Sequence, residues 1–261
     1  MKKIFLQFCS SSDVALIEQN HYVRKMTAEG RGDKSKPVGA VRGHHGQQVH
    51  YLIWYPTEIG LEKIGAISGG SAVYATGVRD AFFGLNKDNR EKVINGIIDN
   101  TLFRLNRPEY NLASKIVSLW RKQIALDWEN LYDVKPFGFE TFVEFDQIGE
   151  NRQRTGALYK ADNWTLAGET QGNTKNHVGK GLTGGLHGNP FNREPVSKKL
   201  VFCKWIPPYT EPQVCEYKSS WRSQTPEEKA LAKDRSFRRK QLTLQAQEQL
   251  KSLLDKPLEL S

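Results

Sequence analysis

The sequence predicts an α/β fold built on a mixed β-sheet, and two observations carry this prediction. Residues 49–55 and 63–74 are β-type runs separated by a Pro/Gly turn, a pattern typical of an antiparallel hairpin. Residues 94–105 and 137–145 are strand-like and flank an amphipathic helix at 111–128. A strand, helix, strand unit implies parallel or near-parallel neighbours within one sheet.

The start of the chain, MKKIFLQFCSS, is predicted to form a first strand. Its apolar stretch is broken by Gln7 and followed by three serines and Asp13, which is too little for export or membrane insertion. Residues 13–22 have apolar side chains at helical spacing, with Asp13 as the expected N-cap. Residues 27–48 form a loop rich in Gly, Lys, Arg and His.

The helix at 111–128 has the clearest pattern in the chain. Asn111 is the expected cap, and the buried stripe is predicted to consist of Leu112, Ile116, Leu119 and Ile124. A Gly-rich basic loop at 171–199 and a last strand at 198–206 follow later in the chain. These segments make up a predicted core domain over residues 1–206.

The composition changes after residue 206. PPYTEP is expected to be a linker, and residues 225–254 are expected to be a highly charged helix without a broad apolar face. Residues 207–261 are therefore predicted to be an appendage of linker and basic helix.

The bulk composition favours a nucleic-acid partner. The 261 residues include 38 Lys and Arg against 29 Asp and Glu, which gives a net charge of +9. Such a charge favours a polyanion over an acidic small molecule. The three cysteines show no CxxC spacing, so neither a disulfide framework nor a zinc or other metal site is predicted. We expect a protein of a reducing compartment, the cytoplasm, or the host cytoplasm if a phage encodes it.

Glu140 is the sharpest candidate for chemistry. It stands in an apolar strand between Phe139 and Phe142. Its carboxylate either faces solvent on the side opposite the core or is held, partly desolvated, in a cleft. In the second case its pKa is raised, and it can take a proton from an attacking amine or hydroxyl.

The segment after Glu140 offers three further candidates. Tyr159 could exchange a proton, Asn163 could bind a base edge and Trp164 could stack on a base. The alternative is structural: Tyr159 and Trp164 cover the sheet edge and Asn163 makes a turn.

Three further polar features each allow a structural and a functional interpretation. Asp99 and Asn100 interrupt an apolar strand and could mark a bulge beside a cleft. His21 ends the first helix, where it is either a dipole partner or a catalytic group. Arg79 and Asp80 form either a structural ion pair or a substrate-positioning pair.

Two basic segments are candidates for contact with a phosphate backbone. The first is the Gly-rich loop, and the second is the terminal helix, where a solvated charged face is the alternative. The residues are Lys175, Lys180 and Arg193 in the loop, and Arg235, Arg238, Arg239 and Lys240 in the helix.

Several blocks in this order resemble the family of the Druantia anti-phage system protein A. The blocks are LIEQNHY, PVGAV, HYLIW, VRDAFFGL, IIDNTLFRL, NLASKIVSLW, FETFVE and GALYKADNWTLAGET, over about residues 14–205. The ETFV and YxAxNW pair is the most specific part. Asp99, Asn100 and Thr101 replace two asparagines and a serine of the family pattern. Glu144, Lys160 and Asp162 also depart from it.

The same order of elements is more distantly similar to GNAT-like acyltransferases, including the phage Mu Mom protein that modifies adenine in DNA. This similarity implies a GNAT-like mixed sheet with flanking helices, splayed between strands 94–105 and 137–145, with a substrate cleft at the splay. The connection NRPEYN lacks the glycines of a pyrophosphate loop. An ordinary acetyl-CoA site is therefore not supported, and the cofactor stays unknown, with an acyl donor as one option. The backbone N–H groups at the start of helix 111–128 remain as an anion site.

Two functions follow from these features. The first is a transferase that moves an acyl or aminoacyl-like group onto a nucleobase substituent in phage or mobile-element DNA. Glu140 would be the base, Tyr159 the acid, and Asn100, Asn163 and Trp164 would hold the substrate. The alternative is a non-catalytic DNA-binding component of an anti-phage defence or mobile-element system, and a structural adaptor is a third option. Expected partners are DNA and co-encoded modification or defence proteins, but no membrane.

Overall fold

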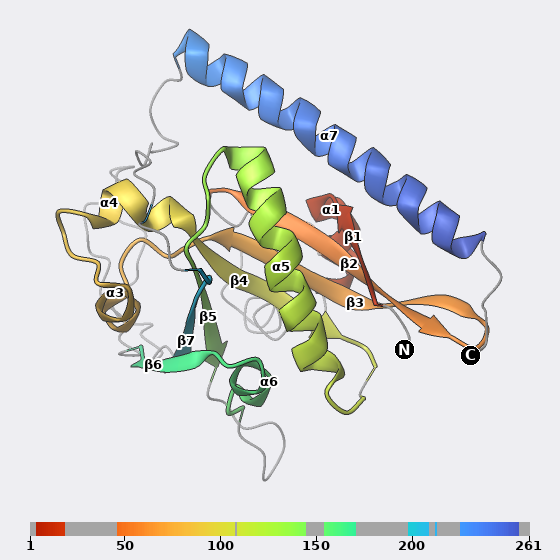
Figure 1. Cartoon of the computed structure of the whole chain (residues 1–261), viewed down its shortest axis with the longest axis horizontal. Helices are drawn as coiled ribbons and strands as arrows, with labels where there is room; N and C mark the ends of the chain where they lie inside the picture. The colour runs from red at the N-terminus through yellow and green to blue at the C-terminus, as the bar shows by residue number, and fades with distance from the viewer. Residues whose placement is uncertain are drawn as a thin grey trace, which may run out of the picture.

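A computed structural model describes residues 4–18, 46–107, 109–144, 154–170, 198–208, 212 and 225–255, and no side chain of residues 15–18. Seven strands form one mixed sheet in this part of the chain, in the order β1-β2-β3-β4-β5-β7-β6 (Figure 1). The strands are β1 Phe5–Cys9, β2 Gln48–Thr57, β3 Gly60–Ser71, β4 Ile97–Leu105, β5 Gly138–Glu144, β6 Thr165–Glu169 and β7 Lys199–Trp205.

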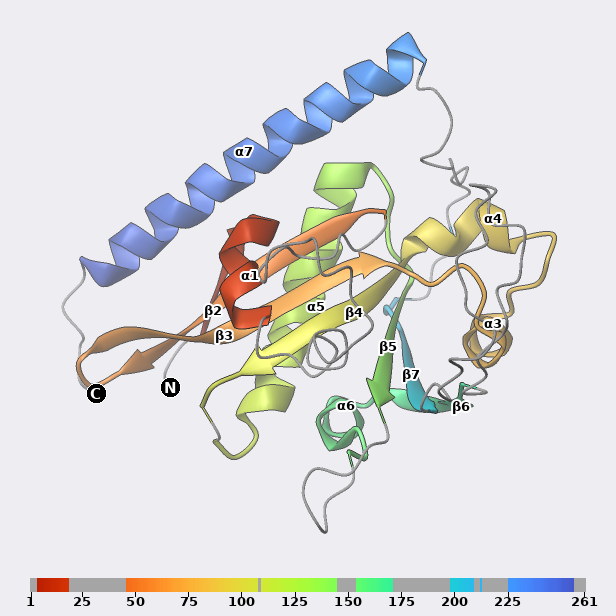
Figure 2. The same cartoon turned by 180° about the vertical axis from the view of Figure 1, so that it is seen from behind.

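Helices flank this sheet. They are α1 Ser11–Glu18, α3 Gly77–Phe83, α4 Arg90–Val93, α5 Leu112–Tyr132, α6 Ala157–Ala161 and α7 Pro226–Leu254, with a 3-10 turn at Ile94–Gly96. Helix α5 crosses one face of the sheet, and α1 lies on the opposite face (Figures 1 and 2). The predicted α/β class with a mixed sheet is confirmed.

The predicted hairpin is β2 and β3, which pair antiparallel from Gln48 with Gly70 to Thr57 with Gly60. The predicted strand, helix, strand unit is β4, α5 and β5. Strands β4 and β5 are parallel, and their ladder runs through three pairs, from Ile97 with Gly138 to Asp99 with Glu140. All other neighbours in the sheet are antiparallel. The strands thus stop pairing directly after the two carboxylates.

Helix α5 packs closely against β3 because Gly69 of that strand has no side chain between the two elements. A Cβ on Gly69 of β3 would lie 2.2 Å from Ile124 Cδ1 and 3.2 Å from the Trp120 ring. The buried stripe differs from the predicted one, since Trp120 is fully buried whereas Leu119 is only partly buried. The aromatic ring fills the layer because a 3.6-residue repeat places 116, 120 and 124 on one face.

Asn111 is the N-cap residue of α5, as expected, whereas the expected N-cap of α1 at Asp13 is wrong. Asn111 has a left-handed backbone (φ 58°) and its side chain makes no capping hydrogen bond. Helix α1 starts at Ser11, two residues before Asp13. The Asp13 carboxylate instead accepts hydrogen bonds from the N–H and hydroxyl of Ser10, because a carboxylate in the first turn can satisfy the donors of the residue before the helix.

The C-terminal helix α7 begins with a capping box between Thr225 and Glu228. Its sequence has no broad apolar face, yet one side of the helix packs against the rest of the protein. Ala246 is buried in the main core and Leu242 packs against it. Arginines supply the other contacts: Arg239 donates to the Gln48 carbonyl at 2.8 Å, and Arg238 pairs with Asp133 at 2.7 Å.

Candidate functional site

A row of reactive side chains crosses the sheet where β4 and β5 stop pairing. Asp99 of β4 is in register with Glu140 of β5, and Glu140 is in register with Cys203 of β7. Residues in register across a sheet present their side chains to the same face. Helix α3 covers this face, which we call the α3 face. The opposite one, covered by α5 and α6, is the α5 face.

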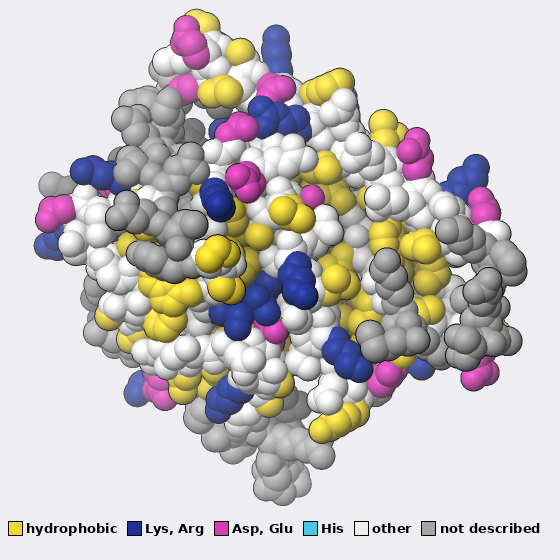
Figure 3. Space-filling model, viewed as in Figure 1, with side chains coloured by type: hydrophobic (Ala, Val, Ile, Leu, Met, Phe, Trp, Pro, Cys, Tyr) yellow, Lys and Arg dark blue, Asp and Glu magenta, His cyan; other side chains and the backbone are white. Residues whose placement is uncertain are grey.

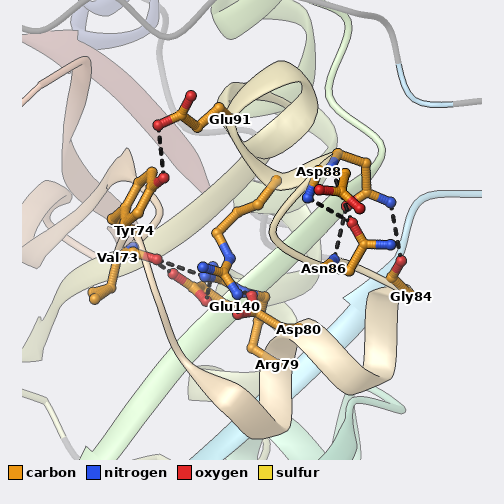
Figure 4. A network of polar contacts seen from close by, with 11 residues as sticks. Val73, Tyr74, Arg79, Asp80, Gly84, Asn86, Asp88, Glu91 and Glu140 are labelled. Atoms are coloured by element: carbon orange, nitrogen blue, oxygen red, sulfur yellow. Dashed lines mark hydrogen bonds and ion pairs between the residues drawn. The ribbon is translucent and has the colours of Figure 1, made fainter.

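Arg79 of α3 links Glu140 of this row to Asp80 of its own helix (Figure 4). Its Nη1 donates to Glu140 Oε2 at 2.7 Å, and its Nε donates to Asp80 Oδ1 at 2.7 Å. Arg90 lies on the other side of Asp80, 2.8 Å from Oδ2. The predicted Arg79 and Asp80 ion pair is confirmed, and it extends to Glu140, 61 residues further along the chain.

Glu140 is 0% exposed, which excludes the solvated alternative. Desolvation raises its pKa from 4.5 to about 7, although Arg79 and the hydrogen bond from the Val73 N–H act in the opposite direction. The Val73 N–H donates to Glu140 Oε1 at 2.9 Å, and the Val73 carbonyl accepts from Arg79 Nη2 at 2.6 Å. The backbone N–H and carbonyl of Val73 therefore cover the ion pair of Glu140 with Arg79.

Asp99 is the second carboxyl group of the row, and it is 8% exposed. Burial raises its pKa well above the usual value, and the neighbouring Glu140 raises it further, while Arg79 and Lys199 lower it. Burial also raises the pKa of the Cys203 thiol to about 12, with Glu140 adding to the effect. Cys203 is accordingly a neutral thiol at physiological pH, and the titrating groups of the row are the two carboxyls.

A bulge adjoins these carboxyls, as the polar pair at 99 and 100 predicted. Gly70 pairs with Asp99 and Ser68 pairs with Leu102, so Gly69 alone faces both Asn100 and Thr101. Bulges of this kind re-aim side chains and are frequent beside functional sites.

The remaining predicted residues of the cleft lie on the α5 face. The Tyr159 hydroxyl donates to Asn100 Oδ1 at 2.7 Å, and Asn100 Nδ2 donates to the Ser68 carbonyl at 2.9 Å. The Trp164 ring packs edge-on against Tyr159, and its Nε1 donates to Asp162 Oδ2 at 2.8 Å. Tyr159 and Trp164 are both buried.

The expectation that Glu140, Asn100 and Tyr159 line one substrate cleft at the splay is wrong, because the sheet separates Glu140 from the other two. The side chains of Asp99, Asn100 and Glu140 are at least nine-tenths buried. The physical reason is the strand repeat of two, which sends neighbours in sequence to opposite faces.

Asn163 makes the turn that was the structural alternative. Its φ is 57°, its N–H donates to the Lys160 carbonyl, and its carbonyl accepts from Lys204 Nζ at 2.9 Å. The residue is exposed. His21, Lys175, Lys180 and Arg193 lie outside the described residues, so their predicted roles stay predictions.

Three of the four predicted phosphate contacts on α7 are engaged within the molecule. Arg239 donates to Gln48 and to the Tyr132 hydroxyl, Arg238 pairs with Asp133, and Arg235 lies over the Tyr132 ring. Lys240 is exposed. On the face seen in Figure 3, Lys and Arg side chains stand in several separate places among apolar and acidic ones.

The sequence interpretation missed Thr101 and Gln47, each of which has a buried side-chain oxygen without a hydrogen-bond partner among the described residues. Thr101 was detectable in principle, because it stands two residues after Asp99. Among the described residues, no group of three His, Cys, Asp or Glu side chains could hold a metal ion. In the same part of the chain, no helix combines the length and apolarity that crossing a membrane requires.

Comparisons with known proteins give one family. The model of the family described as Druantia protein DruA matches residues 35–204, well over half of the chain. A search of curated proteins gave no match. Among solved structures, a crystal structure of a domain from Methanocaldococcus jannaschii DSM 2661 aligns with 79% of this chain and 100% of that chain, at 9% identity and a TM-score of 0.36.

Proposed function

The chain belongs to the DruA family, a component of the Druantia anti-phage defence system, and from this premise we propose that it is a transferase that modifies bases of DNA. The group transferred is of the acyl or aminoacyl type, and the acceptor is a substituent of a nucleobase. The observation that carries the proposal is the buried Asp99 and Glu140 pair at the point where β4 and β5 part.

The arrangement of the strands supports a GNAT-like reaction site. That resemblance predicts a mixed sheet splayed between the fourth and fifth strands, and the parallel ladder of three pairs agrees with it. Ligands of open α/β sheets gather where neighbouring strands diverge. The donor would be an acyl compound other than ordinary acetyl-CoA.

In the proposed reaction Glu140 is the general base. A carboxyl group with a pKa of about 7 is partly ionised at neutral pH, which suits a group that must accept a proton and later release it. Arg79 stabilises the ionised form through the 2.7 Å hydrogen bond to Oε2. Asp80 holds the guanidinium in place from its other side.

Access to Glu140 requires a movement of the Val73 peptide. This segment connects β3 to α3, and the side chains of Val73 and Tyr74 are 48% and 42% exposed. Besides Glu140 and Arg79, two groups of α4 contact this segment: Glu91 accepts a hydrogen bond from the Tyr74 hydroxyl at 2.8 Å, and Arg90 lies over the Tyr74 ring. Displacing Val73 would open the α3 face to a base that has been flipped out of the duplex or is single-stranded.

The residues of the α5 face have a supporting part in this proposal. Asn100 and Tyr159 join β4 to α6 through their 2.7 Å hydrogen bond, and Thr141 of β5 donates to the Asn100 carbonyl at 3.3 Å. Asn163, exposed at its turn, is the group of that segment proposed to contact the substrate. Lys240 and the basic loop are proposed to contact phosphates.

A second candidate is a DNA-binding component without catalysis. The observation that favours it is the closed ion pair of Glu140 with Arg79, which leaves the carboxylate no contact with solvent. Such a protein would use the same face to capture a base or a DNA end.

Mass spectrometry of nucleosides tests the proposal. DNA would be digested from cells that express the complete Druantia system with this chain or with Glu140→Gln. We expect a nucleoside of new mass that disappears with Glu140→Gln and persists with Glu62→Gln, the same change at an exposed ion pair. If the wild-type chain binds DNA but yields no new nucleoside, the binding-only candidate replaces the transferase.

A further inference from the structure

The segment that connects β3 to α3, residues 72–76, covers the ion pair of Glu140 with Arg79, and we call this segment the lid. Its side chains at positions 73, 74 and 75 are exposed. It contacts the ion pair through the backbone of Val73, whose N–H donates to Glu140 and whose carbonyl accepts from Arg79. Breaking these two hydrogen bonds lifts the cover, while the core between the sheet and α5 stays intact.

Both ends of the lid are anchored, so a movement is confined to the residues between them. The N–H of Ser71, the last residue of β3, donates to the Gln47 carbonyl at 2.9 Å, and the Asp80 N–H of α3 donates to the Thr76 carbonyl at 2.8 Å. No described atom lies within 4 Å of where a Cβ on Gly77, the first residue of α3, would be. Loops that close over sites turn at residues of this kind, at the ends of helices and strands.

Helix α4 holds the lid in its closed position. The Tyr74 hydroxyl donates to Glu91 Oε1 at 2.8 Å, as Figure 4 shows, and the Arg90 guanidinium lies 5.6 Å from the centre of the Tyr74 ring. We call these two contacts the Tyr74 latch. Arg90 also lies 2.8 Å from Asp80 Oδ2, and Asp80 accepts a hydrogen bond from Arg79. The same short helix therefore fixes both the lid and the ion pairs beneath it.

The Tyr74 latch lies at the surface, whereas the ion pair beneath the lid is buried. Tyr74 is 42% exposed and Glu91 is exposed, while Glu140 and Arg79 are each 0% exposed. A hydrogen bond at the surface is weak, because water can take the place of either partner. The closed position is therefore held by contacts that can be exchanged for solvent, although the groups that it covers cannot be reached without a movement.

We propose that the lid regulates access to Glu140: the Tyr74 latch keeps the resting protein closed, and DNA binds the open form. The inference rests on the proposed function, which requires Glu140 to meet a base, and it names the regulation of that site. A ligand that binds only the open form has an apparent affinity reduced in proportion to the open fraction. Weakening the latch should therefore strengthen the binding of DNA, although the change removes a contact.

Hydrogen exchange of the Val73 amide in the full-length protein measures the open fraction, because this N–H is bonded to the buried Glu140 carboxylate while the lid is closed. Tyr74→Phe keeps the ring and removes the hydroxyl that donates to Glu91. We expect the amide to exchange about fivefold faster in this variant, the change that the loss of one ordinary hydrogen bond gives. A mixed-sequence single-stranded oligonucleotide should bind to the same variant about fivefold tighter.

Two further variants assign the effect to the latch. Tyr55→Phe is the matched control, because the Tyr55 hydroxyl donates to Glu109 at 2.8 Å and Arg107 lies over its ring, the same two contacts at the β2 and β3 hairpin. It should change neither the exchange of the lid amide nor the binding of the oligonucleotide. Glu91→Ala removes the acceptor and should speed the exchange as much as Tyr74→Phe does, and the two changes combined should do no more than either alone.

The outcomes separate this inference from the function on which it rests. Unchanged exchange in Tyr74→Phe overturns the latch, and faster exchange with unchanged or weaker binding overturns the regulation; either result leaves a DNA-acting protein. Tighter binding by Tyr74→Phe, with no new nucleoside in cellular DNA, supports the regulated access and contradicts the transferase. No binding of the oligonucleotide by any version overturns both.

Discussion

The two faces of the sheet at β4 and β5 hold polar groups in opposite ways. On the α5 face, Asn100 and Tyr159 satisfy one another and the neighbouring backbone. On the α3 face, Glu140 and Asp99 are crowded carboxyls with raised pKa values, and Asp99 Oδ1 has no hydrogen-bond partner in the described part of the chain. A satisfied network stabilises a fold, whereas repelled and unpaired groups persist where function retains them.

The largest expected effect comes from removing the arginine that pairs with the buried carboxylates of the α3 face. Arg79→Met leaves the buried Glu140 and Asp80 without their common partner, and we expect a loss of about 3–5 kcal/mol in the free energy of unfolding, measured with urea. Arg107→Met is the control, because Arg107 is 40% exposed and its pairs with Glu62 and Glu109 are worth less than about 1 kcal/mol. Equal losses for the two variants would show that the buried pair is not special.

The second effect is the pH dependence of stability. The pKa of Glu140 is raised from 4.5 to about 7 on folding, so the folded state holds the proton more tightly across this window. The free energy of unfolding should therefore fall as the pH rises through this range, and the raised pKa of Asp99 acts in the same direction.

Glu140→Gln should flatten this fall, as measured by urea unfolding at a series of pH values. The groups that face Glu140 are Arg79, Asp80, Asp99 and Cys203, and they remain in the variant. Glu62→Gln, at an exposed pair, should leave the slope as it is. An unchanged slope in Glu140→Gln would mean that burial does not raise this pKa.

One substitution applied to both faces sharpens the comparison. Thr101→Val removes an unpartnered hydroxyl and should leave stability unchanged or raise it by up to about 1 kcal/mol. Thr141→Val removes a hydroxyl that donates to the Asn100 carbonyl at 3.3 Å and should lower stability by about 1 kcal/mol. Thr101→Val should therefore have the higher midpoint of thermal unfolding, and a higher midpoint for Thr141→Val would contradict the contrast between the two faces.

The smallest expected effect concerns α7. Arg239→Met removes the donors to the Gln48 carbonyl and the Tyr132 hydroxyl and should cost about 1 kcal/mol, seen as faster hydrogen exchange of the α7 amides. Lys240→Met, on the exposed side, should leave exchange unchanged. If both variants exchange alike, arginine contacts do not hold the helix against the sheet.

Local patterns predicted the elements of the fold well. Alternation gave the β2 and β3 hairpin, the 3.6-residue repeat gave α5, and the polar pair at Asp99 and Asn100 indicated the bulge. Each of these depends on residues close together in the sequence, which is why a single sequence suffices.

The site itself depended on contacts that no local pattern contains. Arg79 meets Glu140 across 61 residues, and the register of β4 against β5 decides that Asp99, rather than Asn100, lies beside Glu140. A shift of one residue would exchange the two faces. Likewise, α7 contacts the rest of the protein through arginines, and a contact surface of this kind has no apolar stripe that the sequence could reveal.

Plating of phage on cells that carry the complete Druantia system tests most directly whether function lies on the α3 face. Three versions of this chain are compared at equal abundance: wild type, Glu140→Gln and Thr141→Val. We predict that Glu140→Gln abolishes protection and that Thr141→Val retains it. Full protection by Glu140→Gln would contradict the account.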